Sequence, residues 1–475
     1  MRPDTNERGG EALPAWCKAL QVSLLEMADQ LRRELRPWTG PARVFTPEEF
    51  GFVPGWMGTE AIQRAIDLAG EKGGIVRLAR GDYVTGTLTL RSHVCLEIGA
   101  GARLLGSTAL VDYPEHHARR LTVQDTSMGM HQSLIFAEGC EDICLRGEGE
   151  IDGRGSQAHF PGEETTQGTP GRPFLLRIID CKRIHISGLT LKNAACWMQD
   201  YLNCEQLLIE GVTVRNHANY NNDGMDIDGC RDVLVRDCRI FSGDDALCFK
   251  GASQRESKRV LVENCEFRSA CNAVKVGTDT QGDFRQVLIR NCRIGGLAVD
   301  PSGLKHPWAD SGVSLEMADG GTLEDFWLTG LTITRARSPF FLRLDDRGRV
   351  KPGDPKPGVG TLRRVLFSQI CGVENGSRGS YIMGIPEKPI RDIVFRDVRL
   401  RQIPSARPVK TEEEFGDMRG AYPDAHMIDP VGDAPAYALW ARHVGGLCLS
   451  DYSVETEGAD PRPAFLLPGA EAAAE

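Results

Sequence analysis

Short apolar runs recur along most of the chain, and small or polar residues bound each of them. Three clear copies begin at Val233, Val260 and Val287 and share the order of three apolar residues, a charged residue, Asp or Asn, and Cys. Repeats of roughly 20 to 30 residues made of short β-branched runs are typical of a solenoid, in which each turn packs on its neighbours. Weaker copies begin at Ile143, Ile184, Leu207, Phe326, Val365, Ile393 and Leu447.

The repeat favours a parallel β-helix over a leucine-rich repeat, because the Leu-x-x-Leu-x-Leu spacing is absent. Cys238, Cys265 and Cys292 recur at steps of 27 residues, as stacked rungs would place them. Since a free cysteine behaves as a small hydrophobic residue, we expect them to form a buried ladder. Asn264 and Asn291 precede two of these cysteines and are expected to form a side-chain amide ladder at a corner of the coil.

The N-terminal part of the chain has helical rather than strand periodicity. Apolar residues at helical spacing, which end before Pro37, predict a helix with one apolar stripe. This stripe either packs on the helix's own domain or forms the contact of a homodimer. A second helix is expected over Thr59–Gly70, with Thr59 as its N-cap, and would cap the solenoid. The stripe consists of Trp16, Leu20, Leu24, Met27, Leu31 and Leu35, and strands are expected over Gly74–Leu78, Gly86–Leu90 and Val94–Ile98.

These patterns predict an all-β chain that forms one parallel β-helix of about ten turns with N-terminal capping helices. The expected regions are an N-terminal helical extension (residues 1–40), the β-helix with the catalytic site (41–455) and a flexible tail (456–475) that is rich in Ala, Pro and Gly.

Composition excludes several classes of function. The net charge is −10, and no Lys/Arg cluster is interleaved with aromatic residues, so no nucleic-acid partner is expected. No run of 18 apolar residues predicts a membrane span. The fifteen cysteines are odd in number and contain no Cys-x-x-Cys pair, which argues against a disulfide framework or a zinc site. Because residues 1–10 also lack a secretion signal, we expect a reducing, cytoplasmic setting.

Two acidic stretches carry the strongest chemical signal. They are Asn221–Asp226 and Ser242–Ala246, and each leads directly into a short apolar run. Asp223 and Asp244 lie 21 residues apart, close to one turn of the coil. Carboxylates that are packed together repel, so one tends to keep a proton while the others stay ionised. Cleavage of a glycosidic bond needs such a pair of an acid and a base or nucleophile.

Aligning the strands that follow these stretches places their polar residues in columns. Asp223, Asp245 and Asn272 form one column, on rungs about 4.8 Å apart. Lys250 and Lys275 are expected to point outward beside them, which favours a functional cluster over a solvated acidic edge. Period-2 alternation sends inward Met225, Leu247, Val274 and Val313, and outward Asp226, Cys248, Ser314, Asp228 and Glu316.

At these motifs the chain resembles glycoside hydrolase family 28, the polygalacturonase and rhamnogalacturonan hydrolase group. Asn221–Asp226 corresponds to the family's Asn-Thr-Asp-Gly-x-Asp with Asn in place of Thr, and Gly243–Asp245 corresponds to Gly-Asp-Asp. The resemblance extends over roughly Glu48–Arg401 and identifies the chain as a divergent member.

The resemblance implies a right-handed β-helix and a hydrolysis that inverts the anomeric centre without a metal or other cofactor. Asp244 would be the general acid, and Asp245 and Asp223 would activate water. The neighbouring carboxylates are expected to raise the pKa of Asp244. Inversion also calls for carboxyl groups about 6.5–9.5 Å apart, which leaves space for the water.

The chain departs from the family pattern at two places. Asn272 stands where the family has His; it can donate a hydrogen bond to the acid but cannot share a proton. Ser314-Leu315-Glu316 replaces Arg-Ile-Lys, whose cations hold the galacturonate carboxylate in polygalacturonases. Glu316 would therefore disfavour a uronate and could instead accept hydrogen bonds from a neutral sugar.

Further substrate contacts are expected around the cluster. Lys250, Lys275 or Arg343 could compensate the charge of Glu316, and Arg343 follows on the next rung. Trp197, on the rung before Asp223, could stack on a sugar or pack in the core.

Three long turns are expected to wall the groove and so to favour cleavage from a chain end. They are residues 156–172, 295–310 and 347–360.

The leading interpretation is an inverting glycosidase that acts on pectin-type or related oligosaccharides, including non-galacturonate ones. One alternative is a calcium-dependent polysaccharide lyase of the same architecture, with Lys250 or Lys275 as its base. Another is a carbohydrate-binding β-helix without catalytic activity.

Overall fold

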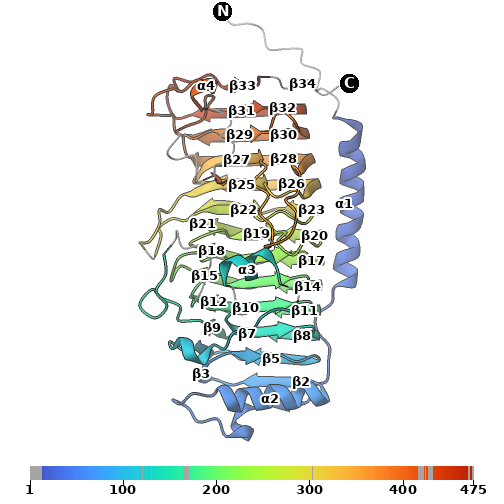
Figure 1. Cartoon of the computed structure of the whole chain (residues 1–475), viewed down its shortest axis with the longest axis vertical. Helices are drawn as coiled ribbons and strands as arrows, with labels where there is room; N and C mark the ends of the chain where they lie inside the picture. Colours follow the sequence, from blue (N-terminus) through green and yellow to red (C-terminus); the bar gives the residue numbers. More distant parts are fainter. Residues whose placement is uncertain are drawn as a thin grey trace, which may run out of the picture.

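The chain forms a parallel β-helix flanked by one long helix (Figure 1). The computed structural model describes residues 13–468 and 471–472, apart from residues 120, 130, 164–170, 302, 416–421, 423 and 426–431. Helix α1 (Ala15–Glu34) runs beside the stack of rungs, and α2 (Thr59–Lys72) closes its N-terminal end. The shorter helical segments are η1 (Pro47–Phe50), η2 (Leu110–Asp112), α3 (Val123–Met128) and α4 (Glu412–Phe415).

One face of the coil is a sheet of twelve parallel strands, and it carries the acidic motifs. Its strands, in stacking order, are β4 (Leu88–Thr89), β7 (Ser133–Glu138), β10 (Phe174–Ile179), β13 (Gln199–Leu202), β16 (Met225–Asp228), β19 (Leu247–Lys250), β22 (Asn272–Val276), β25 (Ala309–Met317), β27 (Ala336–Leu344), β29 (Ser380–Met383), β31 (Leu439–Arg442) and β33 (Phe465–Leu466).

The other faces contain the remaining strands, which also pair in parallel from rung to rung. They are β1 (Val44–Phe45), β2 (Gly74–Leu78), β3 (Gly81–Thr85), β5 (Val94–Ile98), β6 (Ala102–Gly106), β8 (Glu141–Arg146), β9 (Glu150–Asp152), β11 (Lys182–Ser187), β12 (Thr190–Lys192), β14 (Glu205–Glu210), β15 (Thr213–Asn216), β17 (Arg231–Arg236), β18 (Arg239–Ser242), β20 (Ser257–Glu263), β21 (Glu266–Ser269), β23 (Phe284–Arg290), β24 (Arg293–Gly296), β26 (Thr322–Thr334), β28 (Thr361–Asn375), β30 (Ile390–Gln402), β32 (Val444–Thr456) and β34 (Glu471–Ala472).

The rung alignment expected from the sequence is confirmed. Met225 pairs with Leu247, Leu247 with Val274, and Val274 with Val313. All four side chains are buried in one continuous apolar core that runs through the coil. Burying apolar surface contributes about 25 cal/mol per Å², so this stack of inward residues is the main stabilising element.

The repeated Asp and Asn residues stand at a turn that needs a left-handed backbone. Asp237, Asn264 and Asn291 have φ angles of 55°, 56° and 54°, and Gly211 and Gly330 occupy the same turn on adjoining rungs. Asn, Asp and Gly are the residues that adopt this conformation most readily. The backbone therefore explains the column that the sequence attributed to an amide ladder.

The cysteine ladder forms as expected. Cys238, Cys265 and Cys292 are buried, and the amide of Cys238 lies 3.5 Å from the sulfur of Cys265. All fifteen cysteines are free thiols.

Helix α1 packs on its own β-helix. Its apolar stripe covers a ladder that repeats on successive rungs and that faces outward from the coil. Arg32 also pairs with Glu263 on β20. This packing takes up the stripe that was considered for a homodimer. The ladder consists of Leu208, Leu234, Leu261, Leu288, Trp327, Leu366, Val394 and Cys448.

The two ends differ from the sequence expectations in detail. Gly58, not Thr59, is the N-cap of α2, and the Thr59 hydroxyl instead accepts a hydrogen bond from the Gly86 amide at 2.8 Å. The predicted flexible tail (456–475) adds two short strands, because β33 pairs with β31 and β34 with β32. Backbone pairing on the last full rung therefore orders part of this segment.

Candidate active site

The expected column of acidic residues forms at the start of β16, β19 and β22. Asn272 donates from Nδ2 to Asp245 Oδ1 at 2.8 Å and receives a hydrogen bond from the Ser311 hydroxyl at 2.7 Å. The Gly224 amide, next to Asp223, donates to the carbonyl of Asp245 at 2.8 Å and ties the two rungs together. Asp223 and Asp245 are each only 3% exposed, so both carboxyl groups lie in a largely dehydrated environment.

Asn222, the residue of the first motif that stands where the family has Thr, has a structural role. Asn222 is fully buried and donates to the carbonyl oxygens of Ala194 and Cys196, while its own oxygen accepts from the Asn219 amide. These bonds anchor the turn that presents Asp223.

Two buried lysines compensate part of the negative charge. Lys250 Nζ lies 3.6 Å from Asp223 and 3.3 Å from Asp226. Lys275 Nζ lies 3.0 Å from Asp245 and 3.9 Å from Glu316. Both lysines point outward from the coil beside the carboxylates, as the alternation of the strands predicted.

The two acidic motifs differ in their affinity for protons. Burial, reinforced by Asp244 and Asp245, raises the pKa of Asp223 to about 8 against the opposing effect of Lys250. Burial also raises the pKa of Asp226, its outward neighbour on the same strand. The proton expected in the cluster is therefore held on the Asp223 side of the site.

The expected rise in the pKa of Asp244 is wrong for this arrangement. Burial acts to raise it, but Lys305 and Lys275 outweigh burial and lower the pKa. Lys305 reaches in from the turn between β24 and β25, and its Nζ lies 3.2 Å from Asp244 Oδ2. Asp244 is thus ionised and ion-paired in the absence of a substrate.

Glu316 and Arg343 lie on consecutive rungs, as expected, and both are buried. Burial, together with Asp424, raises the pKa of Glu316 to about 8, and Ser314 donates a hydrogen bond to its carboxyl group. Arg343 donates to Asp345 at 2.5 Å, so it already has a carboxylate partner. Arg343 as a substrate ligand stays a prediction.

Trp197 is buried against the site instead of being presented as an open stacking surface. Its ring packs edge-on against Phe174 with centroids 5.6 Å apart, and the Lys250 ammonium lies 4.4 Å from its centroid. The indole therefore helps to hold Lys250 between Asp223 and Asp226.

Asp424 is a site residue that the sequence analysis missed. It belongs to the long insertion between β30 and β31, outside the repeat, but its carboxylate pairs with Lys275. The Asn272 amide also lies 3.3 and 3.4 Å from its two oxygens. The side chain is 2% exposed. No periodic signal could have placed it, because the insertion is not in register with the rungs.

The long turns expected to wall the groove do approach the site. Arg172, at the end of the first, is buried and donates to the Tyr220 carbonyl and to Asn221 Oδ1, both at 2.8 Å. The second carries Lys305. In the third, Arg347 donates to Thr278.

Two groups of side chains have the spacing of possible metal ligands among the described residues. One is Asp244, Asp245 and Cys271 within the site itself. Calcium prefers oxygen ligands, so the Cys271 thiol does not suit it, and Lys305 and Asn272 already contact the two carboxylates.

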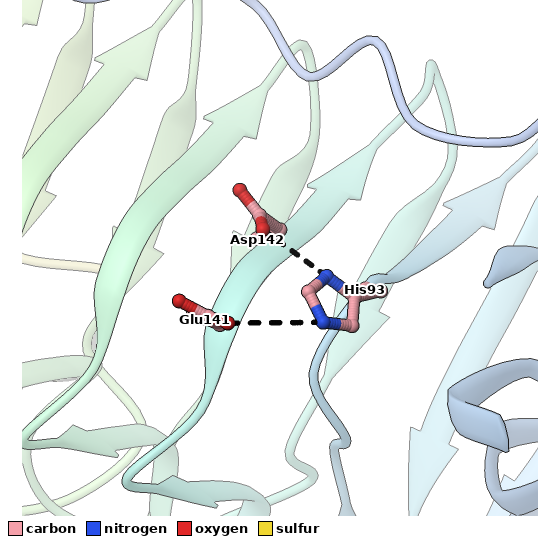
Figure 2. Close-up of side chains that lie close together, drawn as sticks. All are labelled: His93, Glu141 and Asp142. Carbon is pink, nitrogen blue, oxygen red and sulfur yellow. Dashed lines mark ion pairs between the residues drawn. The ribbon is translucent and has the colours of Figure 1, made fainter.

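The second group lies on a different face of the coil. Figure 2 shows His93 beside Glu141 and Asp142, with ring nitrogens 3.8 and 3.1 Å from the carboxylates. Arg183 pairs with both acids, at 2.6 and 2.5 Å. We interpret this group as a surface ion-pair network that connects neighbouring rungs.

Taken together, the molecule is a parallel β-helix with a buried cluster of carboxylates on one sheet. Residues 91–297, which include both acidic motifs, match the family model for glycosyl hydrolases family 28. The resemblance inferred from the motifs is thereby confirmed over this part of the chain. A probable polygalacturonase from Vitis vinifera is 28% identical over 207 residues, which is 41% of this chain and 41% of that protein.

Solved structures show the same right-handed fold. An exopolygalacturonase from Thermotoga maritima matches with a TM-score of 0.68 and 18% identity, covering 80% of this chain and 91% of that one. A family 28 exopolygalacturonase from Yersinia enterocolitica matches with a TM-score of 0.63 and 16% identity, covering 91% and 78%.

Within the described residues, every helix is too short or too polar to cross a membrane.

Proposed function

We propose that this protein is an inverting glycoside hydrolase that acts on pectin-type or related oligosaccharides from a chain end. The observation that carries the proposal is the cluster of Asp223, Asp244 and Asp245, in which adjacent carboxyl groups have pKa values shifted in opposite directions. Glycosidic cleavage requires one carboxyl group that carries a proton and one that is ionised, and the cluster holds both.

In the proposed reaction the sugar displaces Lys305 from Asp244 when it binds. Removal of the cation raises the pKa of Asp244, which takes up the proton held on the Asp223 side of the cluster. Asp244 then donates this proton to the glycosidic oxygen as the bond to the anomeric carbon breaks. A water molecule attacks that carbon and gives its proton to Asp223, which is now ionised, either directly or through Asp245. One proton is thus delivered and one recovered, so the cluster returns to its starting state.

The stereochemistry needs its own test. Oxygens of Asp244 and Asp245 lie within 4.8 Å of one another. Inverting enzymes have about 6.5–9.5 Å and retaining enzymes ~5–5.5 Å between the acid and the carboxyl group that acts at the anomeric carbon, which here is Asp223 or Asp245. Inversion is therefore proposed on the family resemblance, and NMR of the first-formed anomer decides between the two outcomes.

Cleavage from a chain end is supported by the insertion that carries Asp424. Asp424, which follows β30 in the chain, contacts Lys275 and Asn272 on β22, three rungs back from β29. A long polymer threading past the carboxylates would meet this wall. The Thermotoga maritima and Yersinia enterocolitica structures that share this fold are of exopolygalacturonases, which are end-acting enzymes.

The lysine environment supports hydrolysis over elimination. A lyase needs a basic group above the scissile unit. Burial acts to lower the pKa of Lys275, but Asp245 and Asp424 outweigh it and the pKa is raised. Burial also acts to lower the pKa of Lys250, but its acidic neighbours, Asp226 and Asp223 among them, outweigh burial and the pKa is raised. Both amines are held protonated and would be poor bases.

We also propose a reducing, cytoplasmic location. The support is that all fifteen cysteines are free, including Cys238 and Cys265 on adjacent rungs. Such thiols persist best where disulfides do not form.

The experiment is product release from homogalacturonan, rhamnogalacturonan and neutral oligosaccharides by the wild type and by Asp244→Asn. Hydrolysis should fall by about 10²–10⁴-fold in the variant, the usual contribution of a general acid. Asp237→Asn is the matched control, because Asp237 is an exposed turn residue and Asn stands at the same turn on the next two rungs. Binding without cleavage by the wild type would support a carbohydrate-binding protein instead, and an unsaturated product would support a lyase.

A further inference from the structure

Lys275 is surrounded by carboxyl groups of the chain itself. Lys275 pairs with Asp245, and a negatively charged sugar bound beside Asp245 and Asn272 would need this cation. Its ammonium already contacts three carboxyl groups, those of Asp245, Asp424 and Glu316.

The other lysines of the site are engaged in the same way. Lys250 pairs with Asp223 and Asp226, and Lys305 pairs with Asp244. Six carboxyl groups therefore surround three ammonium groups: Asp223, Asp226, Asp244, Asp245, Glu316 and Asp424 around Lys250, Lys275 and Lys305.

The proton balance leaves little positive charge to offer. Burial raises the pKa values of Asp223 and Glu316 to about 8 and also raises that of Asp226. The three ammonium groups are already paired with carboxyl groups of the chain itself. A further carboxylate would enter as an uncompensated buried charge, which is strongly unfavourable.

We propose that Asp424 is a specificity-determining residue that makes the subsite beside Asp245 and Asn272 select an uncharged sugar. This inference rests on the proposed glycosidase function and deepens it. Asp424 occupies Lys275 and faces the Asn272 amide, so it takes the positions that a uronate carboxylate would use. Glu316, held by Ser314, adds a second acidic group to the same subsite and can accept hydrogen bonds from sugar hydroxyls.

Glu316 and Asp424 come from different parts of the fold. Glu316 lies on β25, one rung beyond Lys275, and is fixed by the coil. Asp424 comes from the insertion between β30 and β31, so this insertion completes a subsite built on distant rungs. Changing the one residue should therefore alter the charge preference without altering the catalytic carboxylates.

The test compares two substrates that differ only at C6, a 4-nitrophenyl galacturonide and the corresponding galactoside, or matched oligosaccharides with these sugars at the cleaved end. The wild type should have the higher kcat/KM on the neutral substrate. Asp424→Asn keeps the size of the side chain and removes its charge, which frees Lys275 for a carboxylate. The ratio of kcat/KM for neutral over charged substrate should fall at least about tenfold, mainly through a gain on the uronide.

The matched control is Glu413→Gln, which removes one negative charge from an exposed position of α4 in the same insertion. It should leave the ratio unchanged. If Asp424→Asn does not fold, Asp424→Ser serves the same purpose, because it also removes the carboxylate that pairs with Lys275. A wild type that prefers the uronide, or a ratio that stays the same in the variant, would overturn the inference.

The outcome is distinguishable from failure of the proposed function. A wild type that cleaves neither substrate and none of the oligosaccharides overturns both proposals. Cleavage of the uronide with full sensitivity to Asp244→Asn keeps the hydrolase and removes only the assigned selectivity.

Discussion

Two faces of the same coil use the repeat in opposite ways. On the face covered by α1, Leu208, Leu234, Leu261 and Leu288 stack in register, and each leucine stabilises the next by sharing buried surface. On the face with the acidic motifs, the same register brings carboxyl groups onto adjacent rungs, where they repel. A solenoid therefore amplifies whatever residue is repeated: it strengthens an apolar ladder and creates an energetically costly cluster of charges that a site can use.

The largest effect is expected from the acidic face. Replacing Asp245 with Asn removes a carboxylate that holds Lys275 and Asn272 and that is proposed to activate water. We expect kcat to fall by about 10²–10⁴-fold, as for loss of a general base. Steady-state kinetics beside thermal unfolding of the same preparation measures both quantities. A variant that keeps its activity would remove Asp245 from the mechanism.

On the apolar face, the corresponding change affects stability and not chemistry. Leu261→Ala leaves a cavity between α1 and the coil and should lower the free energy of unfolding by about 2–4 kcal/mol. Denaturant unfolding gives this value, and kcat should be unchanged because the leucine lies away from the carboxylates. An equal loss of kcat at temperatures where the variant is folded would show that the two faces are coupled.

These two faces also differ in how far the sequence predicts them. The pairing of Met225 with Leu247 and Val274 followed from period-2 alternation and a regular step, since both are local properties of the strands. For α1 the sequence predicted an apolar stripe but not the surface on which the helix packs. The structure shows that this surface is formed by the middle apolar residue of each repeat, which points away from the coil.

The site was predicted where it lies on rungs and missed where it lies on loops. Asp223, Asp245 and Asn272 fall on the regular stack, so the sequence placed them together. Lys305 and Asp424 reach the cluster from irregular segments, whose path depends on contacts that no repeat encodes. The wrong sign expected for the pKa of Asp244 has this cause, because the neighbouring acids were visible in the sequence and the cation was not.

A smaller effect should appear in the dependence of stability on pH. The pKa of Asp223 is raised to about 8 in the folded state, mainly by burial, so the folded chain binds this proton more tightly than the unfolded chain. Stability is therefore lost as pH rises from the normal Asp value toward 8.

Asp223→Asn removes that loss and should stabilise the protein near pH 8 by about 0.5–2 kcal/mol, while it abolishes activity. Between pH 5 and pH 8 the free energy of unfolding should change less with pH in this variant than in Asp237→Asn, the surface control. Parallel pH profiles in the two variants would contradict the raised pKa.

The finest test of the acidic face concerns Lys305, which lowers the pKa of Asp244 together with Lys275, against the effect of burial. The general acid must be protonated to act, so a low pKa in the free enzyme confines kcat/KM to lower pH. Lys305→Met should move the alkaline limb of kcat/KM to higher pH, by roughly one unit, whereas Lys351→Met, on a surface turn, should not.

The profile of kcat distinguishes the two possible positions of the lysine in the complex, because kcat reports on the enzyme with substrate bound. If the sugar displaces Lys305, as proposed, the alkaline limb of kcat stays where it is in the wild type and only kcat/KM responds. A shift of both limbs would mean that Lys305 stays on Asp244 during the reaction, and no shift of either would assign the essential acid to another carboxyl group of the cluster.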